Sequence, residues 1–249
     1  MGSVDLITSG SLINFAKAFY HNGNRVVLQI QVVRYECKPF KWNEKAMIYS
    51  KPMNRIITIV GASGVGKTAL VNALNKTGKF TTAYEQHAER PFQALFKRDA
   101  RYALANQIDY LLLRAEQEKQ LRLASKPGLM DGGLDLDFHG FTRLFHSRGW
   151  LADPEYDLCR GVYAFIRETL PPPELIVRLC ADEKTVADRL STRDRINIAS
   201  AADTALFNSY LDQWLASISS DRLLELDASQ ETLGYERSME IILERINLT

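Results

Sequence analysis

One eight-residue stretch constrains the fold of this chain more than any other. Residues 61–68 read GASGVGKT and match in full the phosphate-loop pattern GxxxxGK[ST]. A short β-rich run, RIITIV, precedes the loop, and a segment of helical periodicity, GKTALVNALNKT, follows it. Glycines let the backbone curl so that several N–H groups face phosphate oxygens, and the N-terminus of the next helix adds positive potential. This strand–loop–helix context predicts a domain that binds a nucleoside triphosphate.

The loop also predicts the cofactors. We expect Lys67 to neutralise the terminal phosphates and the Thr68 hydroxyl to ligate Mg²⁺. The residues expected to bind ATP are Gly61, Ala62, Ser63, Gly64, Val65, Gly66, Lys67 and Thr68. The motif does not say whether the γ-phosphate passes to water or to a substrate.

Strand-like and helix-like segments alternate from Met53 onward, which predicts a parallel sheet with helices on both faces. We expect about five strands, at residues 55–60, 80–85, 127–131, 171–180 and 222–228. Helices are expected at 66–77, 91–125 with a break near 98–100, 137–149, 153–170, 182–195, 203–219 and 235–246. Residues 53–249 are therefore predicted to form one α/β domain. Residues 1–52 are interpreted as an N-terminal extension of unclear role, or partly as a start-site artefact.

Composition excludes several classes of protein. The formal net charge is +1 with no basic tail, so nothing indicates bulk nucleic-acid binding. The three cysteines are far apart and show no CxxC spacing, which favours buried thiols in a reducing compartment over a disulfide framework or a zinc site. No apolar run approaches the roughly 18 to 20 residues of a membrane span, and no secretory signal is recognisable. We therefore expect a cytoplasmic protein that does not associate with membranes.

The sequence disfavours a switch GTPase or a motor ATPase. A GTPase needs NKxD after a strand, whereas NKTG at residues 75–78 lacks the aspartate and ends the first helix. An AAA-type ATPase should carry an apolar run that ends in two acids, whereas GLMDGG at residues 128–133 has one. A small-molecule kinase remains.

From Tyr84 onward the chain resembles the deoxyribonucleoside kinase family, which phosphorylates the 5′-hydroxyl of deoxynucleosides. The matching segments, in family order, are YEQHAERPFQALF at 84–96, NQIDYLLLR at 106–114, GLMDGG, PPPELIVRL at 171–179 and RLSTRDR at 189–195. Tyr210 and Trp214 match a pair four residues apart in the helix that follows. The resemblance covers about residues 53–249. It implies a P-loop kinase fold, a nucleoside-like small-molecule substrate and a homodimer formed through helices.

The resemblance also implies roles for the matched residues. Glu85 would be the base that takes the hydroxyl proton, with Glu89 as its rival. Asp131 would organise Mg²⁺ with Thr68. The lid that closes over the γ-phosphate would contain Arg189, Arg193 and Arg195. Gln107 would read the nucleobase edge. The expected pocket walls are Phe96 and Phe141.

Two departures from the family pattern fall on the acceptor side. In the family, the acid of the third strand is normally followed by an arginine, where this chain has Gly132. The family also tends to carry a glutamate shortly after the lid arginines, where this chain has INIAS at residues 196–200, which contains no acid. Three interpretations follow: a deoxynucleoside kinase with an altered acceptor site, a P-loop kinase for another metabolite, or a nucleotide-binding relative with impaired catalysis. Asp135 and Asp137 are interpreted as caps of the next helix, which is the default for Asp137.

Overall fold

The computed structural model describes residues 53–85, 89–191, 201–232 and 234–247. The extension predicted at residues 1–52 lies outside them. The strands are β1 (Ile56–Val60), β2 (Thr81–Ala83), β3 (Gly128–Asp131), β4 (Leu175–Cys180) and β5 (Leu223–Asp227). The helices are α1 (Lys67–Lys76), α2 (Pro91–Phe96), α3 (Ala103–Leu123), α4 (Leu134–Leu136), α5 (Arg143–Ser147), α6 (Asp153–Thr169), α7 (Glu183–Ser191), α8 (Ala201–Leu215) and α9 (Glu236–Arg245). Two further turns are the 3₁₀ turn η2 (Ala100–Tyr102) and the π-helical turn η3 (Asp137–Thr142).

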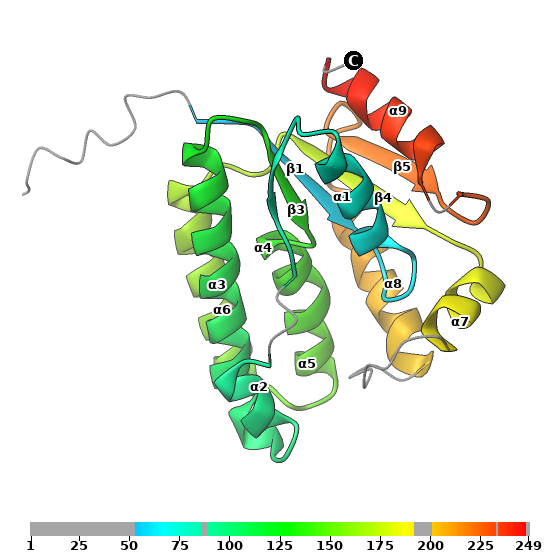
Figure 1. Cartoon of the computed structure of the whole chain (residues 1–249). Helices are drawn as coiled ribbons and strands as arrows, with labels where there is room; N and C mark the ends of the chain where they lie inside the picture. Colours follow the sequence, from blue (N-terminus) through cyan, green and yellow to red (C-terminus); the bar gives the residue numbers. More distant parts are fainter. Residues whose placement is uncertain (1–52, 86–88, 192–200, 233, 248–249) are drawn as a thin grey trace, which may run out of the picture. The chain divides into compact units, whose positions relative to one another are not determined.

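The five strands form one parallel sheet in the order β2-β3-β1-β4-β5 (Figure 1). The predicted α/β fold is confirmed. The central strand β1 leads into the phosphate loop and pairs with β3 so that Ile59 faces Asp131. In an open parallel sheet, ligands bind at the carboxyl ends of the strands. The loop and Asp131 therefore meet at the edge where a binding site is expected.

Alternating side chains of β1 serve two separate cores. Ile57 and Ile59 pack with residues of α1 and α9 in one apolar cluster. Val60 points to the other face and packs with Phe207 and Leu211 of α8. Both faces of the sheet are thus covered, which explains why β1 is buried along its whole length.

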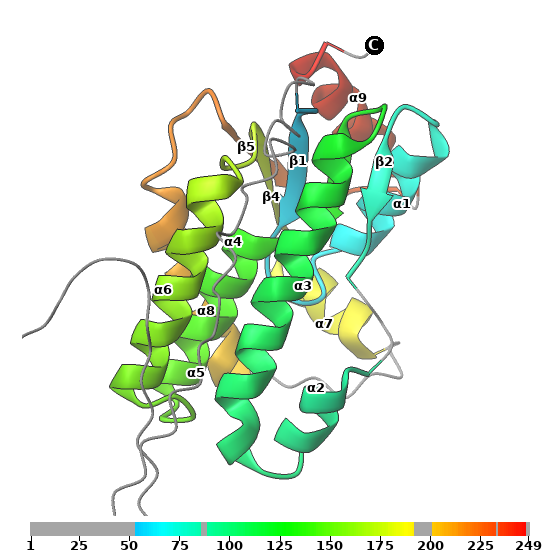
Figure 2. The same cartoon turned by 90° about the vertical axis from the view of Figure 1, so that its left-hand side faces the viewer.

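The long helices α3 and α6 run side by side on the face opposite α1 and α9 (Figure 2). The break predicted near residues 98–100 is present, because α2 ends at Phe96 and α3 begins at Ala103. The helix predicted from residue 137 begins earlier, at Leu134, and passes through η3 before α5. Among the described residues, no helix combines the length and apolar character that crossing a bilayer requires.

Candidate active site at the carboxyl edge of the sheet

The phosphate loop has the backbone geometry that its glycines allow. Gly61 and Gly66 have φ values of +145° and +105°, which L-residues rarely adopt. A Cβ at Gly61 would also lie 2.4 Å from the carbonyl oxygen of Leu179, so the loop runs close against the end of β4. The Lys67 Nζ donates to the carbonyl oxygens of Gly61 and Ala62, each at 2.9 Å. The ammonium group therefore lies over the loop that is predicted to hold the phosphates.

Thr68 and Asp131 meet beside this loop. The Thr68 hydroxyl donates to Oδ2 of Asp131 at 2.6 Å, and the aspartate is fully buried at the end of β3. Its second oxygen, Oδ1, is buried without a hydrogen-bond partner in the described part of the chain. Burial raises the pKa of Asp131 against the opposing effects of the Thr68 hydroxyl and Lys67. A buried carboxylate oxygen with unused acceptor capacity suits a hard cation.

A hydroxyl and one carboxylate fit Mg²⁺ bound together with a nucleotide. Mg²⁺ usually keeps several waters and takes one or two carboxylates plus substrate phosphates. Within the described residues, no cluster of three or more His, Cys, Asp or Glu side chains could form an all-protein metal cage. Thr68 and Asp131 would then be the protein ligands, and phosphate oxygens and waters would supply the others. A bound Mg²⁺ would neutralise charge on the β- and γ-phosphates.

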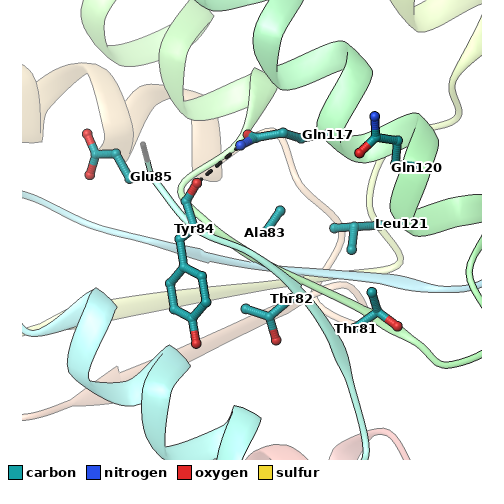
Figure 3. A pocket seen from close by; sticks show the side chains of 8 residues that line it. All are labelled: Thr81, Thr82, Ala83, Tyr84, Glu85, Gln117, Gln120 and Leu121. Carbon is teal, nitrogen blue, oxygen red and sulfur yellow. Dashed lines mark hydrogen bonds between the residues drawn. The ribbon is translucent and has the colours of Figure 1, made fainter. Parts of the chain in front are cut away.

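Glu85 follows the end of β2, past the last residue that pairs with β3. It lies close enough to Asp131, Arg114 and Asp137 to influence the pKa of each. Figure 3 shows this strand end, where the Tyr84 carbonyl accepts a hydrogen bond from Gln117. The rival Glu89 instead forms an exposed ion pair with Lys97 at 2.7 Å. The structure thus brings Glu85 to the group around Asp131.

Arg114 and Asp137 form a buried ion pair close to Glu85. The sequence analysis named Asp137 but assigned no role to Arg114. The Arg114 Nε donates to Oδ2 of Asp137 at 2.8 Å, and the two side chains are 2% and 7% exposed. Burial raises the pKa of Asp137 to about 6, although Arg114 opposes the shift. Burial works against the charge of Arg114, but Asp137 and Glu85 outweigh it and raise the Arg114 pKa. Gln107, also buried, donates to the Asp137 carbonyl oxygen at 3.3 Å.

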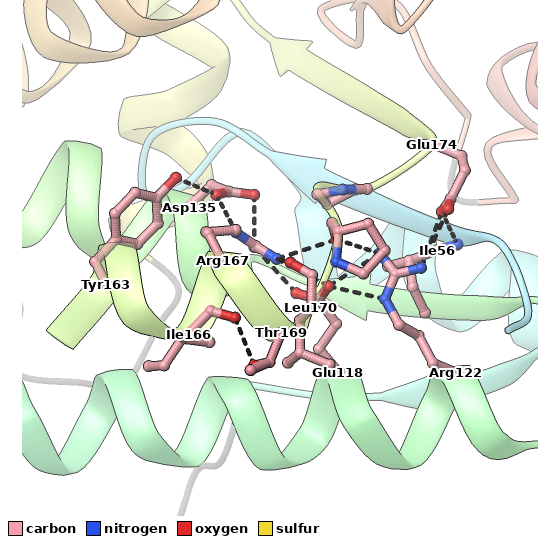
Figure 4. A network of polar contacts seen from close by, with 12 residues as sticks. Ile56, Glu118, Arg122, Asp135, Tyr163, Ile166, Arg167, Thr169, Leu170 and Glu174 are labelled. Carbon is pink, nitrogen blue, oxygen red and sulfur yellow. Dashed lines mark hydrogen bonds and ion pairs between the residues drawn. The ribbon is translucent and has the colours of Figure 1, made fainter. Parts of the chain in front are cut away.

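This pair corrects the interpretation of Asp135 and Asp137 as helix caps. No side chain caps α4, and its N-cap residue is Gly133. Asp137 is bound to Arg114, and Asp135 accepts hydrogen bonds from Arg167 and Tyr163 of α6 (Figure 4). Both aspartates therefore join helices together. A signal for Arg114 existed in the sequence: it follows Gln107 by seven residues, two helical turns, on the same helix face.

Of the three arginines predicted to form the lid, only Arg189 is among the described residues. The Arg189 guanidinium, near the end of α7, donates to the carbonyl oxygens of Val65 at 2.6 Å and Ala228 at 3.0 Å. It therefore contacts the phosphate loop directly. Arg193 and Arg195 lie outside the described residues.

The two phenylalanines predicted as pocket walls lie in apolar surroundings. Phe96 packs against Phe145 and Trp150, with ring centroids 4.9 and 5.4 Å away. Phe141 is partly buried and packs against Phe207 of α8 at 4.8 Å. Their role beside a substrate stays a prediction.

Gly132 has a φ of +79°, so the backbone itself favours glycine here. A Cβ at this position would lie 3.6 Å from Nη2 of Arg114. The guanidinium of Arg114 thus occupies the space beside the residue that departs from the family motif.

Comparison with known families decides to which family this chain belongs. The model of the family described as "Deoxynucleoside kinase" matches residues 57–248. The chain belongs to the deoxynucleoside kinase family. This confirms the resemblance, and the family's activity is ATP-dependent phosphorylation of a deoxynucleoside hydroxyl, which makes the chain a phosphotransferase.

Named relatives agree with the family. The chain is 24% identical over 202 residues to a deoxyadenosine/deoxycytidine kinase of Bacillus subtilis (strain 168), covering 78% of this chain and 93% of the relative. It is 26% identical over 140 residues to a deoxyadenosine kinase of Dictyostelium discoideum, covering 56% and 57% of the two chains. Among solved structures, deoxyadenosine kinase from M. mycoides with bound dCTP matches with a TM-score of 0.64 at 18% identity, covering 78% of this chain and all of the other. The same enzyme with bound dATP gives a TM-score of 0.62 at 20% identity, covering 77% and 99%.

Proposed function

We propose that this deoxynucleoside kinase transfers the γ-phosphate of ATP to the 5′-hydroxyl of its substrate with Mg²⁺ held by Thr68 and Asp131. One observation carries the proposal. The Thr68 hydroxyl of the phosphate loop donates a 2.6 Å hydrogen bond to Asp131, a buried carboxylate whose other oxygen has no partner among the described residues, and Glu85 is close enough to influence the pKa of Asp131. The phosphates of ATP, the metal ion and the general base that accepts the hydroxyl proton would then meet at one edge of the sheet.

Glu85 is the proposed general base. Phosphoryl transfer needs a positioned group that accepts the proton of the attacking hydroxyl. Glu85 neighbours Asp131, whereas Glu89 is engaged with Lys97 on the surface. Lys67 would stabilise the phosphates. The lid would consist of Arg189, which already contacts the loop, and of Arg193 and Arg195, which follow it in the sequence.

The nucleobase of the acceptor deoxynucleoside would be recognised by Gln107 together with the Arg114–Asp137 pair. Deoxyadenosine and deoxycytidine each present an exocyclic amine beside an acceptor ring nitrogen. A carboxylate accepts from the amine, and a guanidinium or amide donates to the ring nitrogen. Thymidine and deoxyguanosine place a carbonyl oxygen where the amine would be, and a carboxylate repels it. The names of the B. subtilis and D. discoideum relatives support the same preference. Phe96 and Phe141 are the proposed walls of this pocket.

We also propose a homodimer formed through α3 and α6. These helices carry large apolar side chains that are unusually exposed: Leu112 at 54%, Leu158 at 52% and Phe165 at 68%. Leu158 and Phe165 are seven residues apart and share a face of α6. Large apolar side chains exposed on adjacent helices indicate an interaction surface, and most soluble oligomers are homo-oligomers. Phe165→Glu should convert the dimer to a monomer in light scattering, whereas Phe92→Glu, on α2, should not. A wild-type protein that is monomeric at micromolar concentration would contradict the proposed homodimer.

The kinase proposal is tested by ADP release with a panel of acceptors. The panel contains the four deoxynucleosides, the ribonucleosides and small metabolite alcohols, each with ATP and Mg²⁺. We expect turnover with deoxyadenosine and deoxycytidine, and a fall of about 10²-fold or more in kcat for Glu85→Gln. Glu89→Gln is the matched control and should keep wild-type turnover. ATP binding without turnover of any acceptor would instead support a catalytically impaired relative. Loss of activity in Glu89→Gln but not in Glu85→Gln would assign the role of general base to Glu89.

A further inference from the structure

The backbone that presents Glu85 is held from α3. Strand β2 lies at the edge of the sheet, and its ladder to β3 ends with Ala83 opposite Met130. Tyr84 and Glu85 therefore follow the last strand pairing. The Tyr84 carbonyl oxygen accepts a hydrogen bond from Nε2 of Gln117 at 3.2 Å (Figure 3). The carbonyl carbon of Tyr84 is bonded to the backbone nitrogen of Glu85, so this contact fixes the peptide group next to the proposed base.

The other end of the Gln117 amide is fixed as well. Its Oε1 accepts from Nη1 of Arg114 at 3.1 Å. Arg114 in turn is held by Asp137 through the buried ion pair. An amide that uses both its donor and its acceptor in this way has one orientation, because a flipped amide would place like groups against each other at both ends. Gly132, which adjoins Arg114, has no side chain that could share this task.

We propose that Gln117 is a positioning residue that couples the Arg114–Asp137 pair to the general base Glu85. The inference rests on the proposed function, in which Glu85 takes the hydroxyl proton. Asp137, Arg114, Gln117 and Tyr84 are linked by a chain of hydrogen bonds, which we call the relay. When the nucleobase of a substrate is bound beside Arg114 and Asp137, the relay holds the end of β2 so that Glu85 lies next to the substrate hydroxyl. A displacement of about 1 Å at a reacting group is enough to lower a rate by roughly 10²-fold.

The chain offers a matched control on the same helix. Gln120 is three residues further along α3, and both glutamines line a pocket of about 560 Å³ beside β2 (Figure 3). The Gln120 amide donates to Glu116 of its own helix at 3.1 Å and does not bridge to the strand end in the described structure. Gln120→Ala therefore removes a comparable side chain without breaking the relay.

The test compares kcat, KM and thermal stability of full-length variants with ATP, Mg²⁺ and deoxyadenosine or deoxycytidine. Gln117→Ala should lower kcat by roughly 10-fold, with the KM for ATP within twofold and a melting temperature like that of Gln120→Ala. Gln117→Glu keeps an acceptor for Arg114 but turns a carboxylate oxygen toward the Tyr84 carbonyl, so it should lower kcat at least as much. Gln117→Ala with wild-type kcat, or Gln117→Glu with wild-type kcat, would overturn the inference.

A double variant separates positioning from general stability. In Glu85→Gln, the group that Gln117 positions no longer acts as a base, so adding Gln117→Ala should lower the residual rate by less than twofold. If the two substitutions instead lower kcat by factors that multiply in the double variant, the coupling is overturned and Glu85 remains the base. Full activity of Glu85→Gln would overturn the base assignment and the positioning role with it. Full activity of Gln117→Ala, together with a strongly reduced kcat in Glu85→Gln, would overturn the positioning role alone.

Discussion

Breaking the Arg114–Asp137 pair should destabilise the protein by an amount that depends on pH in a defined direction. In Arg114→Met, Asp137 stays buried and loses its cation. Removing one partner of a buried pair costs about 3–5 kcal/mol. Protonation accounts for only the pH-dependent part of this loss. Because the pKa of Asp137 is already about 6 in the folded wild type, holding its carboxyl group neutral at pH 7 costs the variant about 1.4 kcal/mol more than the wild type.

The sign of the pH dependence follows from proton counting. In Arg114→Met the folded state holds one proton on Asp137 that the unfolded state releases above pH 3.8. The variant should therefore gain about 1.4 kcal/mol of stability for each unit that the pH falls between 7 and 5. In the wild type, the pKa of Asp137 is about 6, so this group adds the same slope between pH 6 and 3.8 and none well above pH 6. The extra slope of the variant is therefore confined to pH values above about 6.

The assay is urea unfolding at several pH values, supported by thermal melts. At pH 7 we expect a loss of about 3–4 kcal/mol and a fall in Tm on the order of 10 °C for a domain of this size. The double variant Arg114→Met/Asp137→Leu should recover much of the stability, lack the extra slope and remain inactive. A loss below about 1 kcal/mol at pH 7, or a slope shared by the double variant, would refute the reasoning.

Three further predictions concern single residues. Asp131→Asn should raise the Mg²⁺ concentration needed for half-maximal activity by roughly 10-fold or more while ATP still binds without metal in calorimetry; an unchanged Mg²⁺ requirement would contradict this. Gly132→Ala should cost roughly 1–2 kcal/mol in urea unfolding because φ is +79°, and an unchanged midpoint would contradict the strain. Burial lowers the pKa of His139 from 6.5 to about 4. The folded state therefore binds fewer protons than the unfolded state between these values, and stability falls as the pH drops through this window. His139→Gln should flatten that fall in urea unfolding, and an unaltered slope would contradict it.

The features that could be predicted from the sequence are those set by neighbours along the chain. The loop at residues 61–68 carries its own strand and helix, so its fold follows from local pattern. Asp131 could be placed beside it because both lie at carboxyl ends of strands in a parallel sheet, and the register of Ile59 opposite Asp131 brings them together.

The acceptor side could not be predicted in the same way, because its partners are distant in sequence. Asp137 meets Arg114 across 23 residues, and Asp135 meets Arg167 across 32. Judged by local chemistry alone, an aspartate before a helical segment is read as a cap. Burial at the junction of three helices gives these aspartates a different role, and burial depends on tertiary packing that a single sequence does not reveal.

Gly132 shows a related limit. As a sequence feature it is a missing arginine, and it lowers the expectation for catalysis. In the structure it is a residue with positive φ, beside which the guanidinium of Arg114 lies. A cation is thus present near Glu85 and Asp131 although the motif lacks one.

The central claim is that this site transfers phosphate from ATP to a deoxynucleoside, and product analysis tests it most directly. The full chain is incubated with ATP, Mg²⁺ and deoxyadenosine or deoxycytidine, and both products are quantified by chromatography with mass detection. The account predicts one deoxynucleoside 5′-monophosphate for each ADP, with both products formed more slowly in Glu85→Gln by about 10²-fold or more. ADP formed without a phosphorylated nucleoside, or a monophosphate formed equally well by Glu85→Gln, would contradict it.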